Sequence, residues 1–169
     1  LETRYQWNGI CVEANPDSMA ALLACRRVPC VNACVDGSAG IVAFQKNGLF
    51  GGIVAPSEET NAGSAGDVVR MKSIALLELL DTCRAPRVID YLSIDVEGAE
   101  ERVLAGVDYS KYTFRCMTIE RPSQRLRAVL SGNDYQLVKD MPGLDACFVH
   151  RSFVEDYARN ALAFWAGRS

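Results

Sequence analysis

The sequence has little histidine, no long apolar run and no dense cluster of basic residues. His150 is the only histidine and no C-x-x-C pair is present, so no structural zinc site is expected. No window holds about 18 consecutive apolar residues, so no membrane span is expected. The opening LETRYQWNGI lacks the pattern of a signal peptide. The net charge is -3, and without a basic, aromatic-lined groove we expect no nucleic-acid partner.

Cysteine is abundant by contrast. An odd number of thiols within apolar segments indicates buried free cysteines in a reducing compartment, so we expect a cytoplasmic protein. With 169 residues, of which 49% are hydrophobic and 23% charged, the composition indicates a single globular domain. The seven cysteines are Cys11, Cys25, Cys30, Cys34, Cys83, Cys116 and Cys147.

The hydrophobic pattern predicts alternating strands and helices. Residues 41–46 are expected to form a hairpin with 30–35, and the Gly- and Ser-rich residues 47–70 are expected to be one long loop. The alternation ends in a pair of strands, which predicts an α/β sheet, parallel in its body and antiparallel at one edge. Strands are expected at 10–14, 30–35, 41–46, 87–95, 114–120, 135–140 and 145–151, and helices at 16–27, 71–83, 98–108, 123–133 and 152–169.

Acids and amides follow several of these strands. Ligands of open α/β sheets bind beyond the carboxyl ends of the strands, so these side chains predict a site there. Glu13 ends its strand where a carboxylate can accept hydrogen bonds from both hydroxyls of a ribose. The alternative is a helix-terminal acid, but Asp17 already fills that role. The polar positions are Glu13, Asn15, Asn32, Asp95, Glu97 and Glu120.

The acids of IDYLSIDVEGAE, residues 89–100, have two interpretations. They can cap the helix that follows, and Glu100 and Glu101 fit this as first-turn acids on a solvated face. Asp95 fits the capping interpretation less well, because it ends a buried strand, where a charged side chain must either be paired with a partner or serve a function. We therefore expect Asp95 to be the central residue of a site, with Glu97 second.

The segments WNGICVEANP, CVNACV, IDYLSIDVEGAE, VLAGVD and TIERP together resemble the FkbM family of S-adenosylmethionine-dependent methyltransferases. The resemblance implies a class I, Rossmann-like fold and methylation of a hydroxyl on a sugar or another small molecule. It implies that Asp95 acts in catalysis and lies near the cofactor, with Glu97 and Glu120 as further catalytic residues. The implied cofactor-binding residues are Glu13, Ala14, Asn15, Asn32, Ala33 and Asp95.

Two further groups are weighed beside these acids. His150 is expected to be structural rather than a catalytic helper. A divalent ion between the three carboxylates is a less favoured alternative, and no metal is expected.

The family pattern opens with a strand and a glycine-rich loop that this sequence does not contain. We therefore expect residues 1–169 to be one methyltransferase domain that lacks the first central strand and this loop. Cofactor affinity should then be lower, and two sheet edges should be exposed. The alternative function is a non-catalytic, truncated module, which could be a homodimer joined through those edges. A nicotinamide-dependent oxidoreductase is disfavoured, because it also needs a G-x-G-x-x-G turn.

Overall fold

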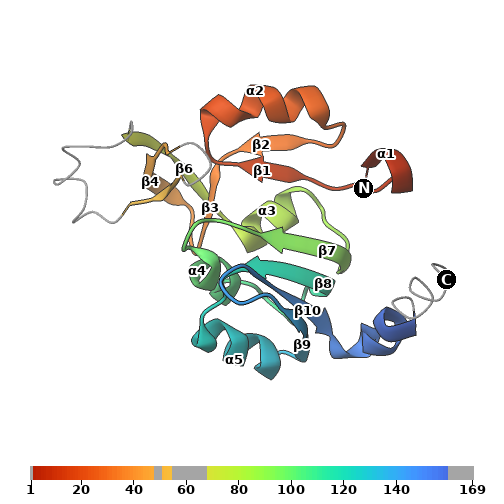
Figure 1. The fold of residues 1–169 in the computed structure, drawn as a ribbon. Helices are drawn as coiled ribbons and strands as arrows, with labels where there is room; N and C mark the ends of the chain where they lie inside the picture. The colour runs from red at the N-terminus through yellow and green to blue at the C-terminus, as the bar shows by residue number, and fades with distance from the viewer. Residues whose placement is uncertain (1, 48–50, 55–67, 160–169) are drawn as a thin grey trace.

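A computed structural model describes residues 2–47, 51–54 and 68–159, and in this part of the chain it shows a mixed α/β fold with several small sheets (Figure 1). None of the described helices is long and apolar enough to cross a membrane. In chain order the elements are α1 (Glu2–Tyr5), β1 (Cys11–Glu13), α2 (Pro16–Cys25), β2 (Cys30–Asn32), β3 (Cys34–Asp36), β4 (Gly40–Gln45), β5 (Gly52–Ile53), β6 (Val68–Ala75), α3 (Leu76–Thr82), β7 (Val88–Ile94), α4 (Glu100–Ala105), β8 (Thr113–Glu120), α5 (Gln124–Gly132), β9 (Tyr135–Asp140), β10 (Asp145–His150) and a 3-10 helix (Arg151–Phe153).

The predicted α/β class is confirmed, but the strands do not form one mostly parallel sheet. Three sheets have the orders β1-β2, β3-β6-β4-β5 and β7-β8-β10-β9. Parallel pairing is limited to β1 with β2, β3 with β6, and β7 with β8, whereas the other pairs are antiparallel. The chain bends at Ala33, so the expected strand 30–35 is divided between two sheets.

The middle sheet differs most from the prediction. The expected hairpin is wrong, because β4 pairs antiparallel with β6 and with β5, while β3 pairs parallel with β6. The expected helix 71–83 is a strand up to Ala75 and a helix only from Leu76. In β6 the exposed Arg70 and Lys72 alternate with the less exposed Met71 and Ser73, which is the two-residue period of a strand. The expected loop 47–70 contains β5 and the start of β6, and its other residues 48–50 and 55–67 lie outside the described part.

The C-terminal half holds the hydrophobic core. Helices α3, α4 and α5 contribute buried side chains to it together with the sheet β7-β8-β10-β9. Tyr135 is 4% exposed, and its hydroxyl accepts a hydrogen bond from Phe114 N at 2.9 Å, which links β9 to the start of β8. The antiparallel pair at 135–140 and 145–151 is confirmed. Of the expected C-terminal helix, residues 154–159 are helical and 160–169 lie outside the described part. The largest fully buried side chains are Phe114, Leu104, Met117, Ile119, Leu126, Leu130, Val103 and Val149.

Strands β1 and β7 each have one edge that pairs with no other described strand. Among these strands, β1 hydrogen-bonds only with β2, and β7 only with β8. Figure 1 shows the pair β1-β2, with α2 beside it, separate from the sheet that begins at β7. The segment before β1 contacts β7, since the rings of Trp7 and Tyr91 meet edge to face with centroids 6.1 Å apart. The carboxyl ends of β1 and β7 can therefore face a common space without a continuous sheet between them.

Candidate functional site

A pocket of about 280 Å³ lies where β1, β3 and the loop after β7 meet. This volume is close to the lower end of the range for small-molecule sites. Four of its residues, Glu13, Asn15, Asp95 and Glu97, place polar groups on its wall. The pocket therefore combines carboxylates with an apolar surface on which a flat ring can pack. Its apolar wall comes from Val12, Ala33, Val35, Phe44, Ile53 and Val96.

Glu13 and Asn15 are held in place by the turn from β1 into α2. Asn15 N donates to Glu13 Oε1 at 2.7 Å, and no described donor is bonded to the second carboxylate oxygen. The Asn15 side chain caps α2 by accepting a hydrogen bond from Asp17 N at 3.0 Å. Asn15 thus lines the pocket beside Ala14, but its side-chain oxygen is engaged in capping.

Asn32 does not line the pocket. Its amide donates to Glu13 O at 2.8 Å and to Ala14 O at 3.0 Å, so it fixes the turn after β1 from the neighbouring strand. The next residue, Ala33, does line the pocket and is 8% exposed. The structure therefore assigns Asn32 an indirect position, while a cofactor contact of Ala33 stays a prediction.

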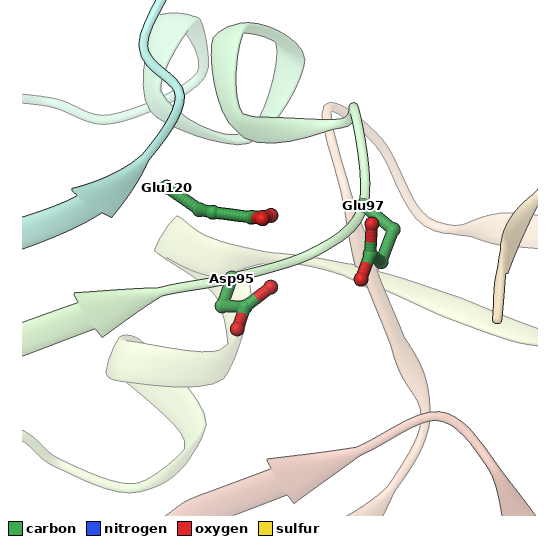
Figure 2. A group of neighbouring side chains, drawn as sticks. All are labelled: Asp95, Glu97 and Glu120. Atoms are coloured by element: carbon green, nitrogen blue, oxygen red, sulfur yellow. The ribbon is translucent and has the colours of Figure 1, made fainter. Parts of the chain in front are cut away.

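Asp95, Glu97 and Glu120 form one acidic cluster. Each offers a carboxylate oxygen within 4.8 Å of the others, and Figure 2 shows the three side chains converging beside the loop that follows β7. Asp95 and Glu97 lie on that loop, whereas Glu120 ends β8 and does not line the pocket. Glu120 Oε2 is buried and accepts no hydrogen bond from the described residues.

Arg121 supplies a positive charge to this cluster. Its Nη2 lies 2.9 Å from Glu97 Oε2 and 2.6 Å from Glu120 Oε1, so one guanidinium bridges two of the three acids. Glu97 has φ 50° and Arg121 has φ 38°, which is the left-handed region that non-glycine residues seldom adopt. Both residues therefore hold a backbone conformation that has to be stabilised by their surroundings. The expectation that this cluster holds no metal stays a prediction.

Asp95 differs from its neighbours in its protonation. Loss of water around it raises the pKa of Asp95 from 3.8 to about 6, helped by a hydrogen bond to Glu120 and by the charges of Glu120, Glu97 and Asp145. A proton on Asp95 can thus be donated to Glu120 Oε2, the oxygen that Arg121 does not bind. One expectation is corrected here: β7 ends at the buried Ile94, and the side chain of Asp95 itself is exposed.

Glu100 is a second correction. We expected it on a solvated face, but its side chain is 8% exposed. Its Oε1 accepts hydrogen bonds from Val96 N at 3.2 Å and Gly98 N at 3.1 Å, so it holds the loop that carries Asp95 and Glu97. Glu101 does face outward as expected, and it is bound by Ser123 and Arg125.

His150 lies outside the pocket, at the end of β10. Its Nδ1 is 2.8 Å from Ser152 Oγ and also accepts from Ser152 N, so it caps the 3-10 helix that follows. Its ring packs edge to face on Tyr135, with centroids 5.2 Å apart. These contacts account for the histidine as a structural residue.

The residues of the site that the sequence analysis did not propose include two from β3 and β4 and two that position the acids. Cys34 and Phe44 line the pocket. Burial raises the pKa of the Cys34 thiol to about 11, so Cys34 contributes an uncharged side chain to the pocket. Arg121 and Glu100 position the acids from outside the pocket. No motif in the sequence identifies Phe44, because β4 is placed beside β3 only through the pairing of both strands with β6.

One comparison with known proteins identifies a relationship. A family model described as "Methyltransferase FkbM domain" matches residues 1–141. Searches of curated proteins and of solved structures gave no match. The matched region includes Glu13, Asp95, Glu97 and Glu120.

Proposed function

The chain belongs to the FkbM methyltransferase domain family, and we propose that it uses S-adenosylmethionine to methylate a hydroxyl group of a sugar or another small molecule. The observation that carries the proposal is the pocket between β1 and β7, which both Glu13 and Asp95 line. Residues far apart in the chain thus meet at the ends of two strands, which is where ligands of α/β folds bind.

The pocket residues fit the chemical groups of this cofactor. The free oxygen of Glu13 can accept hydrogen bonds from a ribose diol, since its other oxygen is already bonded to Asn15 N. Ala33, Val35 and Phe44 form an apolar wall suited to a purine ring. The carboxylates of Asp95 and Glu97 suit a positively charged methionine end. When bound, S-adenosylmethionine supplies a methyl group on a positively charged sulfur.

Asp95 is the residue best suited to handle the acceptor's proton. With a pKa of about 6 it is ionised at neutral pH, yet it is more basic than an ordinary aspartate, as a general base should be. Glu120 can accept a hydrogen bond from Asp95 once that proton has arrived. Arg121 holds Glu97 and Glu120 in place, because its Nη2 lies within ion-pair distance of a carboxylate oxygen of each. The acceptor hydroxyl is then oriented and deprotonated within one cluster.

Calorimetric titration with S-adenosylhomocysteine tests cofactor binding. We expect binding to the wild-type chain, weakened at least tenfold by Glu13→Gln, which corresponds to about 1.4 kcal/mol. Glu101→Gln, outside the pocket, is the matched control and should bind as the wild type does. Absence of binding to a chain that is folded by circular dichroism would refute the cofactor assignment.

A second experiment tests the reaction. The chain is incubated with methyl-labelled cofactor and a panel of sugars and other hydroxyl compounds, and label transfer is followed. We expect Asp95→Asn to abolish transfer while S-adenosylhomocysteine still binds. Equal transfer by Asp95→Asn and the wild type would refute the role of Asp95 as a base.

The unpaired edges of β1 and β7 favour one other candidate, a non-catalytic module that pairs with another copy. Sedimentation of the chain at several concentrations distinguishes the two candidates. A dimer that binds no S-adenosylhomocysteine supports the module, whereas a species that binds it supports the methyltransferase whatever its mass.

A further inference from the structure

Strands β8 and β10 bring two thiols together at a place that does not line the pocket. Cys116 Sγ and Cys147 Sγ are 3.5 Å apart, and both residues are half-buried. In the antiparallel register Cys116 is opposite Val149 and Cys147 is opposite Thr118, so the cysteines are diagonal neighbours on one face of the sheet. The seven free cysteines therefore include one pair whose sulfur atoms are already in contact.

The two thiols are not equivalent. The hydrogen bond between the two sulfur atoms lowers the pKa of Cys147 to about 7 against the effect of burial, and Lys139, which is opposite Cys147 on β9, lowers it further. The same hydrogen bond, together with burial, raises the pKa of Cys116. The positive charge of Lys139 favours the thiolate of Cys147, so Cys147 is the more acidic thiol of the pair. A thiolate beside a thiol is the arrangement in which one sulfur attacks an oxidant and the other resolves the product.

We propose that Cys116 and Cys147 form a peroxide-oxidisable dithiol that closes to a disulfide between β8 and β10. The Cys147 thiolate attacks one oxygen of hydrogen peroxide and breaks the O–O bond, which gives a sulfenic acid and, with one proton, water. The sulfur of Cys116 then attacks the Cys147 sulfur. Its proton and the departing hydroxide form a second water. The two thiols are oxidised by two electrons, and peroxide is reduced to two waters.

The bond can form only if the backbones of β8 and β10 move closer together. A disulfide needs a sulfur separation of about 2.05 Å, so the two atoms have to approach by about 1.5 Å. Diagonal neighbours in a sheet have Cα atoms about 7–8 Å apart, at or beyond the upper end of the disulfide range of about 4.4–6.8 Å. The bond would pull β8 and β10 together and would be under tension. Strained disulfides are the more readily reduced ones, so oxidation of this pair should be reversible by a thiol.

Peptide mapping of the wild-type chain tests the proposal directly. The reduced protein is treated with hydrogen peroxide, free thiols are blocked by alkylation, and the chain is digested with trypsin without reduction. Cleavage isolates Cys116 in residues 116–125 and Cys147 in residues 140–151, each without another cysteine. We expect these peptides to be recovered linked, and dithiothreitol to return both as free thiols.

Other outcomes of the mapping would overturn the proposal. In each of them Cys116 and Cys147 stay fully alkylated while other cysteines are oxidised. Either Cys11 is linked to Cys30, which is opposite it in β1 and β2, or the exposed Cys25 and Cys83 are oxidised. Independent oxidation of the two thiols to unlinked acids would overturn it as well.

Single substitutions test the order of the two steps. In Cys116→Ser, Cys147 should be trapped as a sulfenic acid by dimedone. In Cys147→Ser, Cys116 should react with peroxide at least tenfold more slowly than Cys147 does in the first variant. Cys83→Ser is the matched control and should leave the linked peptides unchanged. Equal trapping at both positions would refute the assignment of Cys147 as the attacking thiol.

Discussion

Replacement of Glu100 by alanine should loosen the loop that carries Asp95 and Glu97. The substitution removes the acceptor of two hydrogen bonds, from Val96 N at 3.2 Å and Gly98 N at 3.1 Å. A hydrogen bond to a charged group contributes about 1.5–3 kcal/mol, and the length of these two places them at the lower end, so together they contribute about 3 kcal/mol. Part of this loss is returned, because the carboxylate, which is 8% exposed, no longer has to be desolvated. We expect the free energy of unfolding to fall by about 2 kcal/mol.

Urea denaturation followed by circular dichroism measures this change. Glu100→Gln retains the acceptor oxygen without the charge and should cost about half as much. Glu101→Ala is the matched control, because this neighbouring acid is on the outer face and should change stability by less than about 0.5 kcal/mol. The Val96 and Gly98 amides should also exchange with solvent faster in Glu100→Ala than in the wild type. If Glu100→Ala matched the control in both measurements, Glu100 would not hold the loop.

Three further predictions concern the acidic cluster and the core. Between pH 4 and 6 the folded chain keeps a proton on Asp95 that the unfolded chain has lost, so this carboxyl lowers the free energy of unfolding as pH rises. Asp95→Asn should remove this loss, which is about 1 kcal/mol over the range after allowance for the exposure of the side chain. An NMR titration of the Asp95 carboxyl centred near pH 4 would contradict this. Arg121→Gln removes the positive charge that binds Glu97 and Glu120, so their negative charges should act more strongly on Asp95 and the same titration should move to higher pH; an unchanged midpoint would show that the guanidinium does not act on Asp95. Tyr135→Phe leaves the buried Phe114 N–H without its acceptor and should reduce the free energy of unfolding by about 1–3 kcal/mol in urea denaturation, whereas no change would mean that water replaces the hydroxyl.

Local pattern predicted much of the C-terminal half of the fold. The strands at 87–95 and 114–120 and the antiparallel pair after them are present, because apolar residues recur in each segment, and the last two are bounded by the turn residues Gly132-Asn133 and Pro142-Gly143. The helix at 123–133 is present as well, and Ser123 caps it by accepting a hydrogen bond from Leu126 N.

The middle sheet could not be predicted in the same way. Residues 71–75 directly precede the Leu-rich helix, and their apolar positions suit either period over so short a length. Only long-range pairing with β3 and β4 makes them a strand, and no single-segment pattern contains that information.

The acids of the site were predicted from their positions at strand ends, but their environments were not. A sequence gives no signal that distinguishes Glu100 from Glu101, because burial depends on the course of the loop in space. The bridging position of Arg121 likewise follows from its left-handed backbone, which turns the side chain back toward Glu97.

The division of the core between the two halves has a consequence for how a ligand would be held. Almost all fully buried apolar side chains belong to residues from Leu76 onward, whereas α2 buries none of its side chains and β1 is only half-buried. Regions with few buried contacts open locally at a lower free energy than the global unfolding transition. The segment that carries Glu13 should therefore exchange its amide hydrogens early, and the segment that carries Asp95 late. A ligand that bridges both would tether a loosely anchored unit to a rigid one, so part of its binding free energy would be used to order the first half of the chain.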